Sequence, residues 1–459
     1  MRRAGKTPRH RRYWGKMRMT PAELSVYFFG QLALIIAAAR LVGWAARRWL
    51  GQPQVVGEMI AGVILGPSLF GLLLPEIQGA VFPQESRSIL FVLAQLGVGL
   101  YMFLVGLQFR SDEFKANAGS AAAVSIAGMA APFALALLIT PLLLSNGGLF
   151  TAGVDRFQAT LFMGAAIAIT AFPMLARIIS ERGLSGTKLG TLSLSAGAID
   201  DAAAWTVLAI VLASLGAGPV VAIKAIAGGG AIALFLIFFG RRLLAPLGRI
   251  AEREGKVSQT LLGVTLMLFA IAALAMDWAG LHAVFGGFLL GAVMPRGFFA
   301  TEVRRILEPT TVVLLLPIFF TFSGLNTQLS LLADPSMFLI AGLILIASIA
   351  GKGIACWAAA RLTGQDNPTA MAIGALMNAR GLMELIIINI GLQKGIITPA
   401  LFSILVLMAI VTTLMASPLF ELVYGRKARA EGALGALGAD QGEPVGGRTK
   451  TVLGAAQTD

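Results

Sequence analysis

Long apolar segments follow one another along most of this chain, and they constrain its fold more than any other feature. A helix needs about 20 apolar residues to cross a bilayer, and about 13 segments of this kind can be read. Membrane strands would alternate in polarity, which these segments do not. The pattern predicts an all-α polytopic membrane protein. The expected helices cover residues 24–45, 53–74, 88–108, 118–144, 158–180, 189–215, 219–240, 257–276, 280–295, 310–326, 336–361, 367–392 and 397–424.

Composition agrees with this fold class. Of the 459 residues, 57% are hydrophobic and 13% are charged, against about 25% charged in an average soluble domain. The net charge of +13 would suggest nucleic acid in a soluble protein. Here the basic residues lie mostly between apolar segments and at the ends, as in a protein embedded in a lipid bilayer. We therefore expect no nucleic-acid partner. No His/Cys cluster and no phosphate loop stand out, so we expect no cofactor and no enzymatic activity.

Charge also predicts the orientation and the ends of the chain. Basic residues gather after every second helix, beginning with Arg47 and Arg48, and the positive-inside rule places those loops in the cytoplasm. The expectation is a bacterial-type inner or plasma membrane protein with its N-terminus outside and its C-terminus cytoplasmic. Residues 1–23 form a basic arm that disagrees with this orientation, which favours a later start site. Residues 24–424 form the membrane domain, and residues 425–459 a flexible cytoplasmic tail.

An internal repeat divides the membrane domain into two halves. The segment Tyr101–Gln108 resembles Phe319–Asn326, and Gly62–Pro67 resembles Gly287–Pro295. Two related halves joined by an odd helix are inverted relative to one another, which is typical of secondary transporters.

Two adjacent carboxylates, Asp200 and Asp201, lie in the middle of an apolar segment. A charge near the bilayer centre costs roughly 2.5–3.5 kcal/mol on the most lenient scale. A pair of them at this depth indicates function. Lys352 lies well inside another apolar segment, between Gly351 and Gly353, and needs a buried partner. Asp200 or Asp201 is the natural candidate, whereas Glu58, near the start of a segment, is expected at the membrane interface.

Helix breaks are predicted in both halves. Thr170, Ala171, Phe172 and Pro173 lie in mid-segment, where the proline should free the Ile169 carbonyl and push Phe172 out of helical geometry. A simple proline kink is the alternative. In the second half, Asn378 and Gly381 suggest another interruption.

Arg380 and Glu384 are four residues apart in that second segment and can pair on one helix face. Their pairing could equally be purely structural. The two predicted breaks occupy corresponding places in the two halves, where transporters place their substrate sites.

These motifs together resemble the cation:proton antiporter-2 family, which includes Kef-type and plant cation/proton exchangers. The resemblance covers roughly residues 24–424 and rests on Gly57–Pro67, Ala198–Trp205, Gly280–Pro295 and Asn378–Glu384. It implies inverted repeats with crossed broken helices, a core transport domain, a dimerisation domain and a homodimer. By motif position, helices 4–6 and 11–13 would form the core.

The resemblance also assigns the site residues. It implies that Asp201 binds the cation or the proton, with Thr170 as a further ligand of the transported ion, and that Asp200 pairs with Lys352. The remaining members, Ala171, Phe172, Pro173, Asn378, Arg380 and Glu384, would line the site at the broken helices. The Asp-Asp form, without the large cytosolic domain of the Kef-type systems, favours Na⁺ over K⁺ and electrogenic exchange.

The expected function is therefore secondary antiport of a monovalent cation against protons by an elevator-type alternating-access cycle. Burial favours the neutral form of a carboxylic acid, whereas a cation requires the ionised form, so binding one expels the other. An organic-anion:sodium symporter on a similar scaffold is the alternative, with Arg380 serving the anion. An intramembrane aspartyl protease needs two carboxylates converging on one water, but adjacent helical residues diverge.

Overall fold

The computed structural model describes residues 19–108, 118–182, 184, 187–214, 224–279 and 283–430. Most of these residues lie in helices, and the only β-pairing within these ranges is an isolated bridge between Phe150 and Ile397. The all-α prediction is confirmed. Because hydrocarbon offers the backbone no hydrogen-bond partner, apolar segments of this length satisfy their own peptide groups as helices.

The first part of the chain contains α1 (Pro21–Leu50), α2 (Gln54–Leu65), α3 (Phe70–Leu73), α4 (Pro75–Val81), α5 (Arg87–Gln108), α7 (Ala118–Ser145), α8 (Arg156–Ala168), α9 (Phe172–Glu181) and α10 (Lys188–Ser214). The second part contains α12 (Gly230–Phe235), α13 (Arg241–Glu254), α14 (Gln259–Ala279), α15 (Ala283–Val293), α16 (Phe298–Thr310), α17 (Leu316–Leu325), α18 (Pro335–Leu362), α19 (Asn367–Leu376), α20 (Leu382–Gln393) and α21 (Pro399–Ala430). Short π-helical segments, η2 (Lys224–Gly229), η3 (Leu236–Gly240) and η4 (Thr311–Leu315), precede α12, α13 and α17.

Nine helices in the described ranges are long and apolar enough to cross a membrane. Every predicted segment overlaps at least one helix, but several are divided, so the number of crossings stays a prediction. Two boundaries were wrong at the chain ends. Helix α1 already begins at Pro21, where Thr20 and Glu23 form a capping box, and α21 continues to Ala430, into the predicted tail.

A third boundary was wrong after residue 240. The helix continues through η3 into α13, so Arg241, Arg249 and Arg253 lie on a helix rather than in a loop. The charges marked an end to the apolar run, but α13 is amphipathic and remains helical. Its apolar side includes the buried Leu244 and Ala251.

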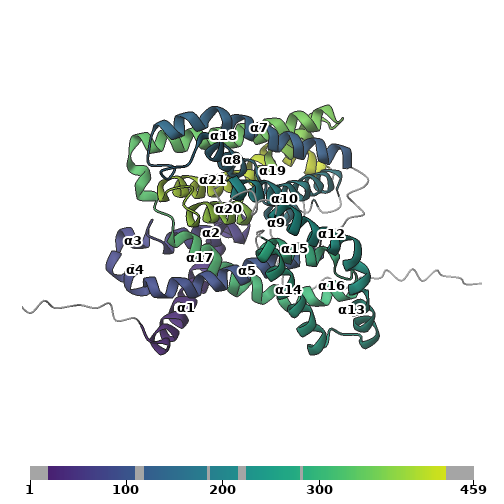
Figure 1. Cartoon of the computed structure of the whole chain (residues 1–459). Coiled ribbons are helices and arrows are strands. Elements are labelled where there is room, and N and C mark those ends of the chain that lie inside the picture. The colour runs from purple at the N-terminus through teal and green to yellow at the C-terminus, as the bar shows by residue number, and fades with distance from the viewer. Residues whose placement is uncertain are drawn as a thin grey trace, which may run out of the picture.

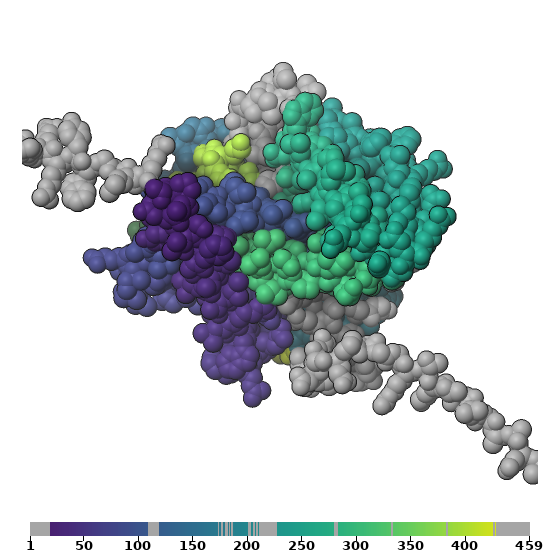
Figure 2. All heavy atoms as spheres, turned by 90° about the horizontal axis from the view of Figure 1, so that it is seen from below, coloured from purple at the N-terminus to yellow at the C-terminus, as the bar shows by residue number. Residues whose placement is uncertain are grey.

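The helices form two packed groups, which lie one above the other in Figure 1. The upper group contains α7, α8, α10 and α18 to α21, with α7 packed on both α8 and α18. In the lower group, α5 packs on α15 and α2 packs on α17. Seen from below in Figure 2, α1 and the segment from α12 to α14 occupy opposite sides of the lower group, with α5 and α17 between them.

The lower group shows the internal repeat as two equivalent helix crossings. A Cβ atom added at Gly66 would lie 2.1 Å from the carbonyl oxygen of Gly324, so α2 and α17 cross with backbones in contact. In the repeat, Gly66 corresponds to Gly291 and Gly324 corresponds to Gly106. An added Cβ at Gly291 would likewise lie 3.0 Å from Cα of Gly106, where α15 crosses α5. The matching glycines therefore serve matching contacts in the two halves.

Candidate functional site

Two interrupted helices meet in the upper group. Helix α8 ends at Ala168 and α9 begins at Phe172, while α19 ends at Leu376 and α20 begins at Leu382. The backbone nitrogen of Ala171 donates to the carbonyl oxygen of Ala379 at 3.1 Å, so the two breaks touch directly. The crossed broken helices that the sequence predicts are present. Such non-helical backbone is tolerated at this depth only where protein or a cavity surrounds it.

The position of the first break corrects one prediction. Pro173 is the second residue of α9, and Phe172 is helical rather than pushed out of helical geometry. A proline in the first turn of a helix leaves no hydrogen bond unmade, since that turn has no acceptor for its nitrogen. The interruption comes earlier, where Ile169 is extended with φ −79° and ψ 134°. Phe172 is almost fully buried and belongs to the hydrophobic core.

Asp200 is the centre of a buried polar cluster. Its Oδ1 accepts a hydrogen bond from Ser125 on α7 at 2.5 Å. Its Oδ2 accepts from Thr170 in the first break at 2.8 Å and from Nζ of Lys352 on α18 at 2.7 Å. The Asp200 and Lys352 side chains are both completely buried. Three donors from three different elements thus hold this carboxylate in place.

The C-terminal end of α8 is neutralised by two cations. Lys352 donates to the carbonyl oxygen of Ala168. The Arg380 guanidinium donates to the carbonyl oxygens of Ala166 at 3.0 Å and Ile167 at 2.5 Å. A helix end carries about half a negative charge and up to four carbonyls without intrahelical partners. The two side chains therefore supply both the charge and the donors that this truncated helix lacks.

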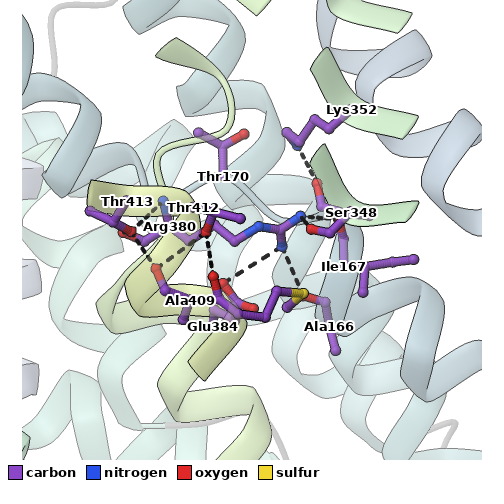
Figure 3. Close-up of polar contacts among 12 residues, drawn as sticks. Ala166, Ile167, Thr170, Ser348, Lys352, Arg380, Glu384, Ala409, Thr412 and Thr413 are labelled. Atoms are coloured by element: carbon purple, nitrogen blue, oxygen red, sulfur yellow. Dashed lines mark hydrogen bonds and ion pairs between the residues drawn. The ribbon is translucent and has the colours of Figure 1, made fainter. Parts of the chain in front are cut away.

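Figure 3 shows how Arg380 is held. Its side chain runs from the second break between Glu384 and Ser348 towards Ala166 and Ile167. It donates to the Ser348 hydroxyl, and its Nη1 lies 3.6 Å from Oε2 of Glu384. Arg380 and Glu384 are fully buried, and the pairing at a spacing of four residues is the one that the sequence suggested. Most of the guanidinium N–H groups therefore already donate to protein acceptors.

Helix α21 fixes the backbone of the second break. The Thr413 hydroxyl accepts from the Arg380 nitrogen at 3.1 Å and lies 2.7 Å from the Arg380 carbonyl oxygen. Across the breaks, the Thr170 hydroxyl also lies 3.0 Å from the carbonyl oxygen of Met377. The geometry of both interruptions therefore depends on threonine hydroxyls as well as on the backbone bond between them.

Asn378 leaves an acceptor unused inside the second break. Its Nδ2 donates to the carbonyl oxygen of Gly374 at 2.9 Å, whereas its Oδ1 is buried and has no hydrogen-bond partner among the described residues. A buried amide oxygen without a donor is costly, so such atoms call for a ligand or a water.

The structure describes only some of the other residues that the sequence singled out. Asp201 follows Asp200 on α10, but its side chain lies outside the described residues, as does that of Pro173. Ala171 is buried and joins the site through its backbone alone. Glu58 is 1% exposed on α2, where Gln54 donates to it at 3.1 Å; its place at the membrane interface stays a prediction.

Sequence reasoning missed Ser125, Ser348 and Thr413, which are buried and bonded to the site. Ser348 could have been found, because it precedes Lys352 by four residues and shares its helix face. Ser125 and Thr413 had no such signal, since hydroxyls in apolar helices usually bond to their own helix backbone.

Comparisons with known proteins agree with this architecture. The family model "sodium/hydrogen exchanger, transmembrane" matches residues 36–423. The chain is 38% identical to the Na⁺/H⁺ antiporter NhaS4 of Synechocystis over 86% of its length and 96% of the relative. It is 33% identical to cation/H⁺ antiporter 19 of Arabidopsis thaliana, again over 86% of the chain but only 49% of the plant protein.

Among solved structures, the sodium proton antiporter MjNhaP1 of Methanocaldococcus jannaschii matches 90% of the chain and all of that protein, with a TM-score of 0.61. The sequence identity is 16%, so this match supports the fold alone. The apolar helices and the family match together identify an integral membrane protein. The chain belongs to the transmembrane sodium/hydrogen exchanger family.

Proposed function

We propose that this protein is a secondary active antiporter that exchanges a monovalent cation, Na⁺ in preference to K⁺, for protons. Antiport of cations against protons is what the names of its relatives describe. The crossed broken helices support it as well, because interrupted helices expose backbone dipoles at mid-membrane, where transporters bind ions.

The proposal rests mainly on Asp200, whose carboxylate oxygens are both already bonded to protein donors. Both of its oxygens accept hydrogen bonds, and Lys352 balances its charge. A carboxylate held in this way has little capacity left for a transported ion. Adjacent positions on a helix are rotated by about 100°, so we expect the two neighbouring carboxylates to have different roles. We assign the exchangeable ion to Asp201.

At Asp201, the cation and the proton compete. Low dielectric surroundings favour the protonated carboxylic acid, whereas a bound cation requires the carboxylate. Sodium prefers oxygen ligands, and two oxygens near the breaks are candidates to share it: the unpartnered Asn378 Oδ1 and the Thr170 hydroxyl. Either ion then neutralises the site, which allows the loaded carrier to cross.

The Asp200–Lys352 pair gives the cycle a second titratable element. If its proton occupancy changes during transport, net charge crosses the membrane and voltage contributes about 2.3 kcal/mol per charge per 100 mV. We assign electrogenic coupling to this pair. Lys352 also donates to the end of α8, so the pair is connected to the first break.

The two packed groups fit an elevator cycle. The upper group carries the broken helices and would be the moving core domain, while the lower group, with its glycine crossings, would be the dimerisation scaffold of a homodimer. The N-terminus would lie outside and the C-terminus in the cytoplasm, as loop charge indicates.

Symport of sodium with an organic anion is not favoured. That function would need a free cation side chain for the anion, and Arg380 was the candidate. Its terminal nitrogens donate to Ala166, Ile167 and Ser348.

The experiment is a proteoliposome assay of proton flux driven by Na⁺, K⁺ or Li⁺, with the membrane voltage clamped and unclamped. We expect Na⁺ to drive the largest flux and its apparent affinity to fall as pH decreases. An affinity independent of pH would refute competition at one carboxylate. Flux that is unchanged by clamping would refute electrogenic exchange, and stimulation of Na⁺ uptake by an organic anion would favour symport.

A further inference from the structure

The turn between α1 and α2 connects the two packed groups of helices. It consists of Gly51, Gln52 and Pro53, and α2 then packs on α21 of the upper group (Figure 1). The Gln52 side chain is 5% exposed, and its Nε2 donates to the carbonyl oxygen of Leu414 on α21 at 3.0 Å. A side chain of the lower group therefore holds the backbone of the upper group.

The Leu414 carbonyl can accept this bond because Pro418 lies four residues later within α21. In a regular helix the carbonyl would accept from the backbone nitrogen of residue 418, but proline has no N–H to donate. A carbonyl enclosed between helices without a donor is costly. Gln52 supplies the donor that α21 itself lacks, so the bond between the groups replaces a missing bond within the helix.

A second side chain strengthens the same junction. Arg182 directly follows α9, the helix that begins at the first break, and it is 6% exposed. Its Nη2 donates to the Ser417 hydroxyl and, at 3.4 Å, to the carbonyl oxygen of Gly51 in the turn. Its Nη1 forms an ion pair with the carboxylate of Glu421 on α21. One guanidinium group thus bridges α9, α21 and the turn.

The junction is close to the ion site along the chain. Thr413, whose hydroxyl holds the Arg380 backbone in the second break, immediately precedes Leu414. Arg182 is connected to the first break by the single short helix α9. Both broken helices are therefore linked to the turn, one through α9 and the other through α21.

We infer that the α1–α2 turn is a latch: its bonds to Leu414 and Arg182 hold the upper group in the position seen here and must break before that group moves. The inference rests on the elevator cycle proposed above and adds the contact that stabilises one of its end states. Bonds between the two groups favour only the position in which they form. Gln52 and Arg182 are thus positioning residues that bias the equilibrium without touching the ion.

The test measures a distance between the two groups by double electron–electron resonance in the full-length protein in liposomes. Spin labels are attached at Trp49→Cys on α1 and Leu422→Cys on α21, two exposed positions. The single native cysteine, Cys356, is fully buried, so labels attach at the introduced sites. An excess of unlabelled protein leaves one labelled copy in each dimer. We expect two distances, the shorter one from latched molecules.

Gln52→Leu should lower the ratio of latched to released molecules by about two- to ten-fold, the effect of losing one hydrogen bond. Pro418→Ala should lower it as well, because it restores a backbone N–H that satisfies the Leu414 carbonyl in both positions. The two substitutions together should have no larger effect than either alone. The matched control Gln31→Leu removes a bond to the Val81 carbonyl within the lower group and should leave the ratio unchanged.

Arg182→Gln removes the second bridge and should also lower the ratio, which keeps the test decisive if Gln52→Leu does not fold. Two distances whose ratio ignores Gln52→Leu and Arg182→Gln would overturn the latch alone. Additive effects of Gln52→Leu and Pro418→Ala would also overturn it, since they would show that the missing helix bond plays no part. A single distance in every variant, with and without sodium, would refute the elevator motion itself and the latch with it.

Discussion

Lys352 and Asp200 form a completely buried ion pair, with 2.7 Å between Nζ and Oδ2. The same lysine nitrogen donates to the carbonyl oxygen of Ala168, at the end of a broken helix. One side chain therefore connects the titratable pair to the interruption that forms the site. Its removal should affect both stability and transport.

We expect Lys352→Met to destabilise the protein by about 3–5 kcal/mol, because it leaves a buried carboxylate without its counter-charge. Asp200→Asn combined with Lys352→Met should recover much of that loss, since the double variant has no uncompensated charge. Thermal unfolding in detergent measures both, with the exposed Lys256→Met as the control. A single variant as stable as the parent protein would show that the pair is not coupled in this way.

Thr170→Val should weaken sodium binding. The variant loses the one hydroxyl that lies within hydrogen-bond distance of both Asp200 and the Met377 carbonyl. Asp200 keeps its bonds from Ser125 and Lys352, so the cost is that of one lost bond, about 1–3 kcal/mol. The sodium concentration for half-maximal flux should rise by about ten-fold or more. Thr170→Ser retains the hydroxyl and should stay close to the parent protein. Equal effects of the two substitutions would show that packing, not the hydroxyl, matters.

The glycine crossings should not tolerate a methyl group. An added Cβ at Gly324 would lie 1.9 Å from the carbonyl oxygen of Gly62, so Gly324→Ala should destabilise by about 1–3 kcal/mol. Gly291→Ala, at the equivalent crossing of α15 and α5, should destabilise the protein by a similar amount. The control is Gly263→Ala on α14, which has open space around it and should stabilise by about 0.5–1 kcal/mol. A harmless Gly324→Ala would contradict the close approach of α2 and α17.

Outside the membrane, Asp366 should contribute to stability in a pH-dependent manner. Lys427 and Thr369 donate to its carboxylate and lower its pKa to about 2, from 3.8. Because the folded pKa is depressed, the contribution is fully present above about pH 4 and is lost as pH falls through 2. The pair is half exposed, so the gain should stay below about 1 kcal/mol.

The melting temperatures of the parent protein and Asp366→Asn should therefore differ slightly at pH 6 and converge between pH 4 and 2. Asp277→Asn, at an exposed position on α14, controls for the loss of a surface carboxylate. A difference that stays constant down to pH 2 would be inconsistent with the ion pair.

The helices and the central ion pair could be predicted because each follows from a local cost. A long apolar segment must form its own backbone hydrogen bonds, and Lys352, within such a segment, needs a buried counter-charge. The partners supplied by tertiary packing could not be predicted. Ser125 and Thr413 meet the site across helix contacts that leave no periodic signal. Glu58 lies near a helix start, yet α2 buries it against neighbouring helices.

The exchange of a cation for a proton at Asp201 is the central claim, and the variant Asp201→Asn tests it most directly. The neutral amide can neither release a proton nor balance a cation. The measurement is the sodium-dependent pH change in proteoliposomes of the parent protein, Asp201→Asn and the control Asp277→Asn at equal protein density. The account predicts full exchange in the control and none in Asp201→Asn; a sodium-dependent pH change that persists in Asp201→Asn would contradict it.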